Sequence, residues 1–292
     1  MPELPEVETV RRGLETALEG RVIQSVEARR ADLRVPLPER MAERLMGRAV
    51  AAVRRRAKYL LIDLDDGNTL IVHLGMSGSF RLAAGNAEIR PTLYHPQSRL
   101  EKHDHVVFRL SDGGIATFND PRRFGLMRLA PTVSVETDGH LGDLGIEPLG
   151  GLLDAATLAK AMAGRKIALK TALLDQSVVA GLGNIYVCEA LHRAGLSPRR
   201  SASTLARKDG SPTIRATALA PAIVDVLVEA VEAGGSTLRD FSATDGALGY
   251  FQHRFRVYDR EGKPCPKPGC GGTIERIVQG GRSTYFCPRC QR

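Results

Sequence analysis

The chain has 292 residues, with 41 Lys+Arg against 33 Asp+Glu and a formal net charge of +8. This length fits about two domains, and 43% apolar with 25% charged residues excludes a wholly disordered chain, because such a composition can build a buried core. No run approaches the ~18–20 apolar residues of a membrane span, and the N-terminus lacks the basic flank and apolar run of a secretory signal, so we expect a cytoplasmic protein without a membrane partner.

The N-terminal half is predicted to be one helix followed by strands. In residues 3–19 apolar side chains recur at helical spacings of three and four, and Gly20 ends the pattern. From about residue 21 to 130 the signal is mainly β. Turns containing Asp-Gly separate runs 59–64 and 69–74, and runs 105–110 and 115–118, which predicts two hairpins. Segment 83–102 has no periodicity and is predicted to be a loop.

The composition changes after residues 148–151, where the chain becomes rich in Ala, Leu and Val at helical spacing. Helices are predicted at 154–163, 168–177, 184–194 and 213–233. We therefore expect an α+β, multidomain protein: a helix plus antiparallel β-sandwich over residues 2–130, a linker over 131–150, a helical domain over 151–240 and a cysteine-rich tail over 256–292.

Basic side chains gather in five short clusters, at 29–30, 54–58, 122–123, 165–166 and 199–200. A basic surface attracts polyanions, above all nucleic acid. For any one cluster a solvated charged face remains an equal alternative. Several clusters in one chain favour a nucleic-acid partner.

Four of the five cysteines lie near the C-terminus: Cys265, Cys270, Cys287 and Cys290. Two close pairs separated by sixteen residues fit one Zn²⁺ held by four thiolates, and the arm between them reads as strand, Gly-Gly turn, strand. The alternative is two disulfides, which a reducing compartment disfavours. Four thiolates leave no open coordination position, so the zinc is expected to be structural. Cys188 stands in an apolar helical pattern and is predicted to be a core residue.

Several longer motifs carry a family resemblance. They are Pro2-Glu-Leu-Pro-Glu-Val-Glu-Thr-Val, Arg55-Arg-Ala-Lys-Tyr-Leu-Leu, His73-Leu-Gly-Met-Ser-Gly, Lys102-His-Asp-His-Val, Asp120-Pro-Arg-Arg-Phe-Gly and Gly181-Leu-Gly-Asn-Ile-Tyr. Together with the four-cysteine tail, and in the same order over nearly the whole chain, they resemble bacterial formamidopyrimidine-DNA glycosylase. That family removes 8-oxoguanine and ring-opened purines from duplex DNA and then cuts the strand at the abasic site. Leu4 favours it over the similar endonuclease VIII family, which usually has glycine there.

The resemblance implies four catalytic residues. It assigns the nucleophile to Pro2, a proton donor to Glu3, a proton donor in β-elimination to Lys58, and δ-elimination with phosphate binding to Arg282. The residues fit this chemistry, because removal of Met1 is expected before a small residue and would expose a secondary amine. An α-amine titrates near ~8, well below lysine at ~10.4. The alternative for Pro2 is a simple N-terminal helix cap, and for Glu3 a first-turn acid favoured by the helix dipole. Glu6, one turn on, is a secondary candidate.

The resemblance also implies DNA contacts. Met76, Arg122 and Phe124 match the side chains that fill the space left by the extruded nucleotide, and further contacts are implied at His103, Arg165, Lys170 and Asn184. Core packing is the alternative for Met76 and Phe124, and helix N-capping is the alternative for Asn184. The loop that clamps the extruded base is expected within 241–255.

The chain departs from the family pattern at its first cysteine pair, spaced C-x4-C instead of C-x2-C, and at Arg165, where lysine is usual. It is also longer around 83–102 and 206–212. Two other functions stay open from the sequence: an endonuclease VIII-like glycosylase for oxidised pyrimidines, and a non-catalytic DNA-binding zinc protein. A monomer is expected.

Overall fold

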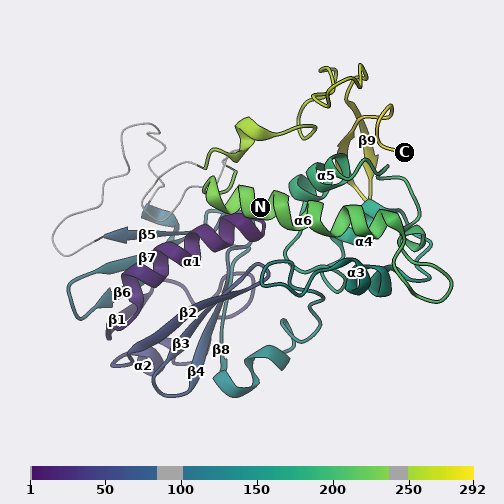
Figure 1. Ribbon diagram of the computed structural model, residues 1–292. Coiled ribbons are helices and arrows are strands. Elements are labelled where there is room, and N and C mark those ends of the chain that lie inside the picture. Colours follow the sequence, from purple (N-terminus) through teal and green to yellow (C-terminus); the bar gives the residue numbers. More distant parts are fainter. Residues whose placement is uncertain (1, 84–100, 237–248) are drawn as a thin grey trace. The chain divides into compact units, whose positions relative to one another are not determined.

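The computed structural model describes residues 2–83, 101–236 and 249–292 (Figure 1). The chain divides into two compact units, the first made of residues 1–142 and 233–250 and the second of residues 143–232 and 251–292. Among the described residues, no helix has both the length and the apolar character needed to cross a bilayer. The two larger sheets lie in the first unit, and most of the helical structure lies in the second.

Two four-stranded antiparallel sheets form the body of the first unit. One has the order β1 (Ile23–Ala28), β6 (Asp104–Leu110), β7 (Ile115–Asn119), β5 (Ser79–Ala83). The other has the order β2 (Val50–Arg56), β3 (Tyr59–Leu64), β4 (Asn68–His73), β8 (Leu126–Pro131). The two predicted hairpins are confirmed as β3–β4 and β6–β7. The individual bounds of β1, β2, β5 and β8, and the short helix α2 (Met41–Leu45), were not predicted from the sequence.

Helix α1 (Leu4–Leu18) confirms the helix predicted over 3–19. It contacts β2 and β3 of one sheet and β5 of the other. Its residues Val7, Val10 and Leu14 are fully buried in a core that both sheets share, because their spacing places them on one face of the helix. The start of α1 is therefore held in place by the packed core of the first unit.

The second unit is helical and ends in a small hairpin. Its helices are α3 (Ala155–Met162), α4 (Leu169–Leu174), α5 (Asn184–Arg193) and α6 (Ile214–Glu232), which confirms the four predicted helices. The hairpin pairs β9 (Glu275–Gln279) with β10 (Arg282–Phe286), as expected for the arm between the cysteine pairs. Both turn residues, Gly280 and Gly281, have positive φ, the combination that a tight two-residue hairpin turn requires. Helix α5 contacts α4, α6 and β10.

Most of the predicted loop 83–102 lies outside the described residues, as does most of segment 241–255. Residues 101–103 form a short 3₁₀ turn before β6. In segment 206–212 the backbone N–H of Arg207 donates to Ser211 O at 2.8 Å, so that insertion is a closed surface turn.

Candidate active site and zinc centre

Pro2 and Glu3 immediately precede α1, and both are buried. The backbone N–H of Glu3 donates to Oε2 of Glu6 at 2.8 Å. The other oxygen of Glu6 accepts from the backbone N–H of Ser236 at 2.8 Å and from its hydroxyl at 3.0 Å. Glu6 is only 2% exposed, so its carboxylate fixes the backbone beside Pro2 from inside the first unit.

Lys58 lies in the tight turn between β2 and β3, one residue before β3 begins. The preceding Ala57 has φ +52°, an uncommon conformation for a residue with a Cβ. Arg55 holds this turn, donating through Nη1 to Ala57 O at 2.9 Å and through Nε to Glu8 of α1 at 3.0 Å. Lys58 is 6% exposed. Arg55 therefore ties the turn that carries Lys58 to the helix that follows Pro2.

His73, at the end of β4, is held neutral by its surroundings. Burial, with a smaller contribution from the nearby Lys58 ammonium, lowers the pKa of His73 to about 4. Its Nδ1 accepts a hydrogen bond from the backbone N–H of Gly75 at 2.9 Å, which also requires an unprotonated nitrogen. The neutral ring thus supports the turn that carries Met76.

Met76 and Phe124 lie on two turns whose backbones meet at Gly75. A Cβ at Gly75 would be 2.3 Å from the carbonyl carbon of Phe124, and Gly75 has φ +62°. Only glycine fits this approach. Phe124 is 43% exposed, so it is not the core residue that the alternative allowed, and Met76 is half-buried.

Asp120 joins these two turns. It is fully buried and accepts from the hydroxyl of Ser77 at 2.7 Å and from the backbone N–H of Gly125 at 2.7 Å. The Ser77 oxygen in turn accepts from the backbone N–H of Arg122 at 3.1 Å. One buried carboxylate therefore sets the positions of the turns that present Met76 and Phe124.

Arg122 and His103 complete this group in the first unit. The guanidinium of Arg122 lies 4.9 Å from the centre of the Phe124 ring, and both side chains are exposed. Such a cation–π contact orients two exposed side chains together. The carbonyl of His103 accepts from the backbone N–H of Asp120 at 3.0 Å, and His103 is half-buried. The structure thus brings together all four DNA-contact candidates of this unit.

In the second unit, Lys170 and Asn184 reach the same carbonyl of the C-terminal hairpin. Nδ2 of Asn184 donates to Ser283 O at 2.8 Å, and Nζ of Lys170 lies 3.4 Å from it. Helix α5 begins at Asn184 with Gly183 at the N-cap position, so the N-cap alternative for Asn184 is wrong. Lys170 has no exposed surface. Both side chains support the residue next to Arg282, and their contacts with DNA stay predictions.

Arg282 is exposed at the first position of β10, directly after the Gly-Gly turn. Pro2, Glu3 and Lys58 belong to the first unit, whereas Arg282 belongs to the second. Arg165 is half-buried, and its guanidinium contacts Ala161 O at 2.9 Å and Asp175 at 3.4 Å. These are local contacts that leave its predicted DNA contact untested.

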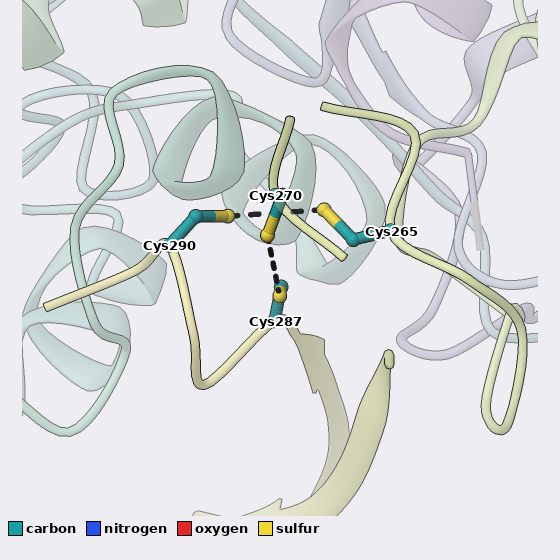
Figure 2. A group of neighbouring side chains, drawn as sticks. All are labelled: Cys265, Cys270, Cys287 and Cys290. Atoms are coloured by element: carbon teal, nitrogen blue, oxygen red, sulfur yellow. Dashed lines mark hydrogen bonds between the residues drawn. The ribbon is translucent and has the colours of Figure 1, made fainter. Parts of the chain in front are cut away.

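The four C-terminal cysteines converge on one point, as Figure 2 shows. All four sulfur atoms lie within 4.8 Å of one another, and the pairs Cys265–Cys290 and Cys270–Cys287 are 3.8 and 3.6 Å apart. A tetrahedral site with Zn–S bonds of ~2.3 Å requires sulfur atoms ~3.8 Å apart, so the donor set fits one zinc ion. None of the five cysteines, all of which lie within the described residues, forms a disulfide, which excludes the disulfide alternative. Cys188 is buried, as predicted.

Sequence reasoning missed several supporting residues. Asp120 and Ser77 stand inside motifs that were recognised, but the sequence did not show that their side chains meet. Glu189 was also missed: its buried carboxylate accepts from three consecutive backbone N–H groups, at residues 256–258. A glutamate between apolar neighbours on both sides in the chain was the available signal.

Family models match three consecutive parts of the chain. Residues 1–127 match the formamidopyrimidine-DNA glycosylase N-terminal domain, residues 144–242 the formamidopyrimidine-DNA glycosylase H2TH domain, and residues 262–292 the zinc finger found in FPG and IleRS. The third match fits the cysteine cluster of Figure 2.

Similar proteins cover the chain from end to end. Formamidopyrimidine-DNA glycosylases of Azorhizobium caulinodans and Beijerinckia indica are 62% and 61% identical to it, each over 100% of both chains. The structure is similar to that of wild-type Lactococcus lactis Fpg in a complex with DNA containing N7-benzyl-Fapy-dG, with a TM-score of 0.83 at 35% identity over 100% of both chains. A complex of Lactococcus lactis Fpg with abasic-site DNA gives 0.82 at 36% identity, also over 100% of both chains. The chain belongs to the formamidopyrimidine-DNA glycosylase family.

Proposed function

We propose that this protein removes oxidised purines from duplex DNA through its Pro2 amine and then cuts the strand at the abasic site. The observation that carries the proposal is the buried Pro2-Glu3 pair at the start of α1, held by Glu6. The relatives' complexes with DNA that contains N7-benzyl-Fapy-dG or an abasic site support this substrate class. The chain is a DNA glycosylase and AP lyase by family. The reaction is expected where the chromosome lies, in the cytoplasm.

The first step is displacement of the damaged base. After Met1 is removed, the lone pair of the Pro2 nitrogen attacks C1′ of the deoxyribose, and the electron pair of the glycosidic bond leaves with the base, which takes a proton. The nitrogen then loses its proton and the C1′–O4′ bond breaks, which gives a Schiff base and a ring-opened sugar. An amine is suited to this step because it forms a covalent intermediate at a carbonyl-type carbon.

The α-amine is favoured over a lysine for this role. Its ordinary pKa near ~8 leaves more free base at neutral pH than a lysine at ~10.4. The position of Pro2 before the first turn of α1 adds to this, because the positive end of a helix dipole disfavours a cation. Glu3 is adjacent and would donate the proton that O4′ takes when the ring opens.

Strand cutting requires two eliminations from the Schiff base. Removal of a C2′ proton expels the 3′ phosphate, and a second elimination expels the 5′ phosphate. We assign the proton transfers of the first elimination to Lys58. We assign the grip on the flanking phosphate and the second elimination to Arg282, because a planar guanidinium pairs with two phosphate oxygens at once.

Base extrusion is assigned to the first unit's exposed turns. An enzyme that acts on a base inside a duplex must turn the nucleotide out of the stack. Apolar and flat side chains on a rigid support can occupy the vacated space. Met76, Arg122 and Phe124 have this character, and the buried Asp120 fixes the turns that present them. His103, Arg165, Lys170 and Asn184 are proposed as further contacts to the DNA backbone.

The zinc centre is assigned a structural role. The ion would be held by Cys265, Cys270, Cys287 and Cys290. When bound, it would cross-link the C-terminal segment and leave no open coordination position for a substrate. Arg282 then stands on a hairpin whose base is closed by Cys287. The purpose of this arrangement is to hold one arginine on a small rigid arm.

The proposal is tested by borohydride trapping on a duplex with a single 8-oxoguanine opposite cytosine. Mature protein is expected to form a covalent adduct when borohydride is present and to cut the strand when it is absent. Protein that retains Met1 is expected to do neither. An adduct at full yield with Met1 in place would contradict the role of Pro2.

The same assay separates the two other functions. Faster cutting of a thymine-glycol duplex would favour the endonuclease VIII-like activity. Tight binding of the lesion without an adduct would favour a non-catalytic DNA-binding protein. Binding in each case is expected to weaken steeply with salt, because basic side chains release counterions from DNA.

A further inference from the structure

A histidine of the helical region lies against one of the zinc ligands. Nε2 of His192, in the last turn of α5, is 3.3 Å from Sγ of Cys265. His192 is 3% exposed, so water does not compete well for this nitrogen. Neither the zinc-finger pattern nor the cysteine spacing involves this residue, which stands 73 positions before Cys265.

The surroundings of the ring determine which nitrogen carries the proton. A zinc-bound thiolate has no proton, so in its contact with Nε2 it can only accept. Nδ1 is buried and has no hydrogen-bond partner among the described residues. A proton on Nδ1 would therefore be buried without an acceptor, at a cost of about 1–3 kcal/mol. With hydrogen on Nδ1, the lone pair of Nε2 would also face the thiolate with no proton between them, so both ring nitrogens would be unpaired. The tautomer with hydrogen on Nε2 pairs that nitrogen with the thiolate and leaves only Nδ1 unpaired.

We infer that His192 is a positioning residue of the zinc centre, which donates an Nε2–H···Sγ hydrogen bond to the Cys265 thiolate. The inference concerns this chain's own side chains and does not depend on the role of Pro2. Four thiolates around Zn²⁺ carry an excess of two negative charges, and a hydrogen bond withdraws electron density from the sulfur that receives it. Residues that hydrogen-bond to metal ligands commonly change metal affinity 10- to 100-fold.

Cys265 is a ligand for which such a partner matters. It begins the longer C-x4-C loop of this chain, and it is partly exposed, whereas Cys270 and Cys287 are buried. The hydrogen bond from His192 holds the Cys265 sulfur in place within this longer loop.

The contact also helps to hold α5 against the C-terminal segment. Along this helix Asn184 donates to Ser283 O of the hairpin, Glu189 accepts from the backbone at residues 256–258, and His192 reaches Cys265. Of these three contacts, the one from His192 ends on a metal ligand. Helix α5 therefore supports the hairpin, the backbone at residues 256–258 and the zinc site.

The test compares His192→Phe with His192→Gln in the full-length protein. Phenylalanine keeps the ring but has no N–H, whereas the glutamine amide can place an N–H near the position of Nε2. His192→Phe is expected to release Zn²⁺ to a chromogenic chelator about tenfold faster than the unsubstituted protein. His192→Gln is expected to release it at a rate close to that of the unsubstituted protein. His140→Phe, at an exposed position of the first unit, controls for the substitution itself.

A spectroscopic measurement separates hydrogen bonding from packing. In Co²⁺-loaded protein, loss of the N–H···S bond makes the thiolate more electron-rich. The sulfur-to-cobalt charge-transfer band of His192→Phe is therefore expected at lower energy than in the unsubstituted protein. The band of His192→Gln is expected close to that of the unsubstituted protein. Unchanged zinc release and an unchanged band in His192→Phe would overturn the inference. Faster zinc release with a band that neither substitution moves from its position in the unsubstituted protein would also overturn it, because packing of the ring would then explain the faster release.

Discussion

The backbone N–H of Ser236 donates a 2.8 Å hydrogen bond to the carboxylate of Glu6, 230 residues earlier in the chain. The neighbouring Gly235 has φ +80°, and a Cβ there would lie 3.1 Å from Cγ of Glu6, so the two segments are in close contact. Because the other oxygen of Glu6 holds the N–H of Glu3, one buried side chain joins the residues after Pro2 to the segment that follows α6. Both segments belong to the first unit.

Glu6→Gln is expected to slow base excision at least tenfold. The amide replaces one accepting oxygen with an NH₂ group, so either Glu3 or Ser236 loses its acceptor, at a cost of about 1–3 kcal/mol. Single-turnover excision of 8-oxoguanine and urea unfolding measure the two effects. The control is Glu15→Gln on the same helix, whose exposed ion pair with Arg11 is worth well under about 1 kcal/mol. Equal effects from the two substitutions would contradict the role of Glu6.

Gly75→Ala is expected to displace the turn that carries Met76. The new Cβ would meet the Phe124 backbone at 2.3 Å, and backbone cannot move aside as a side-chain end can. The control is Gly67→Ala, which has a similar positive φ of +78° but nothing within 4 Å of its Cβ. Gly67→Ala should cost only about 1 kcal/mol, from backbone strain, whereas Gly75→Ala should cost more and should also weaken lesion binding. Thermal unfolding and binding to an abasic-site duplex are the measurements.

Stability is expected to fall between pH 6.5 and 4 because of His73. Its pKa is about 4 in the folded protein and near 6.5 when unfolded. The unfolded chain therefore takes up the proton first, so the stabilisation is complete above pH ~6.5, is lost as the pH falls to ~4, and changes no further below that. The full shift corresponds to about 3 kcal/mol.

His73→Asn tests this assignment. The asparagine Oδ1 can still accept from Gly75 N–H but does not titrate. Urea unfolding at several pH values gives the free energy of unfolding as a function of pH. Between pH 6.5 and 4, its slope in the variant should correspond to about one proton fewer taken up on unfolding. The same slope in both proteins would assign the pH dependence to other groups.

Arg282→Ala is expected to lose strand cutting while zinc content stays unchanged. Loss of a charged hydrogen-bonding group to phosphate costs about 1.5–3 kcal/mol, or roughly 10- to 150-fold. Arg276→Ala, on the neighbouring strand of the same hairpin, is the control, because its Nε contacts Ser283 at 3.0 Å within the hairpin. Nicking of an abasic duplex and zinc determination by atomic absorption give the two readouts. Loss of zinc in Arg282→Ala would mean that this arginine is structural.

The sequence alone determined the features that depend on local geometry. The apolar spacing before Gly20 predicted α1, the Asp-Gly turns predicted β3–β4 and β6–β7, and the Gly-Gly pair predicted the β9–β10 turn. The zinc ligands were also evident, because each cysteine pair is close in the chain and a short hairpin suffices to bring the two pairs together. These structures need contacts over only a few residues or one turn.

Only the tertiary structure decided which distant side chains meet. Three contacts join segments that are dozens of residues apart in the chain. They are the hydrogen bond from Ser77 to Asp120, the contacts of Asn184 and Lys170 with the carbonyl of Ser283, and the contact of His192 with Cys265. Periodicity shows which face of a helix or strand is buried but not what it is buried against. That partner is set by the packing of whole sheets and helices, so the supporting residues of the site became visible only when the chain was folded.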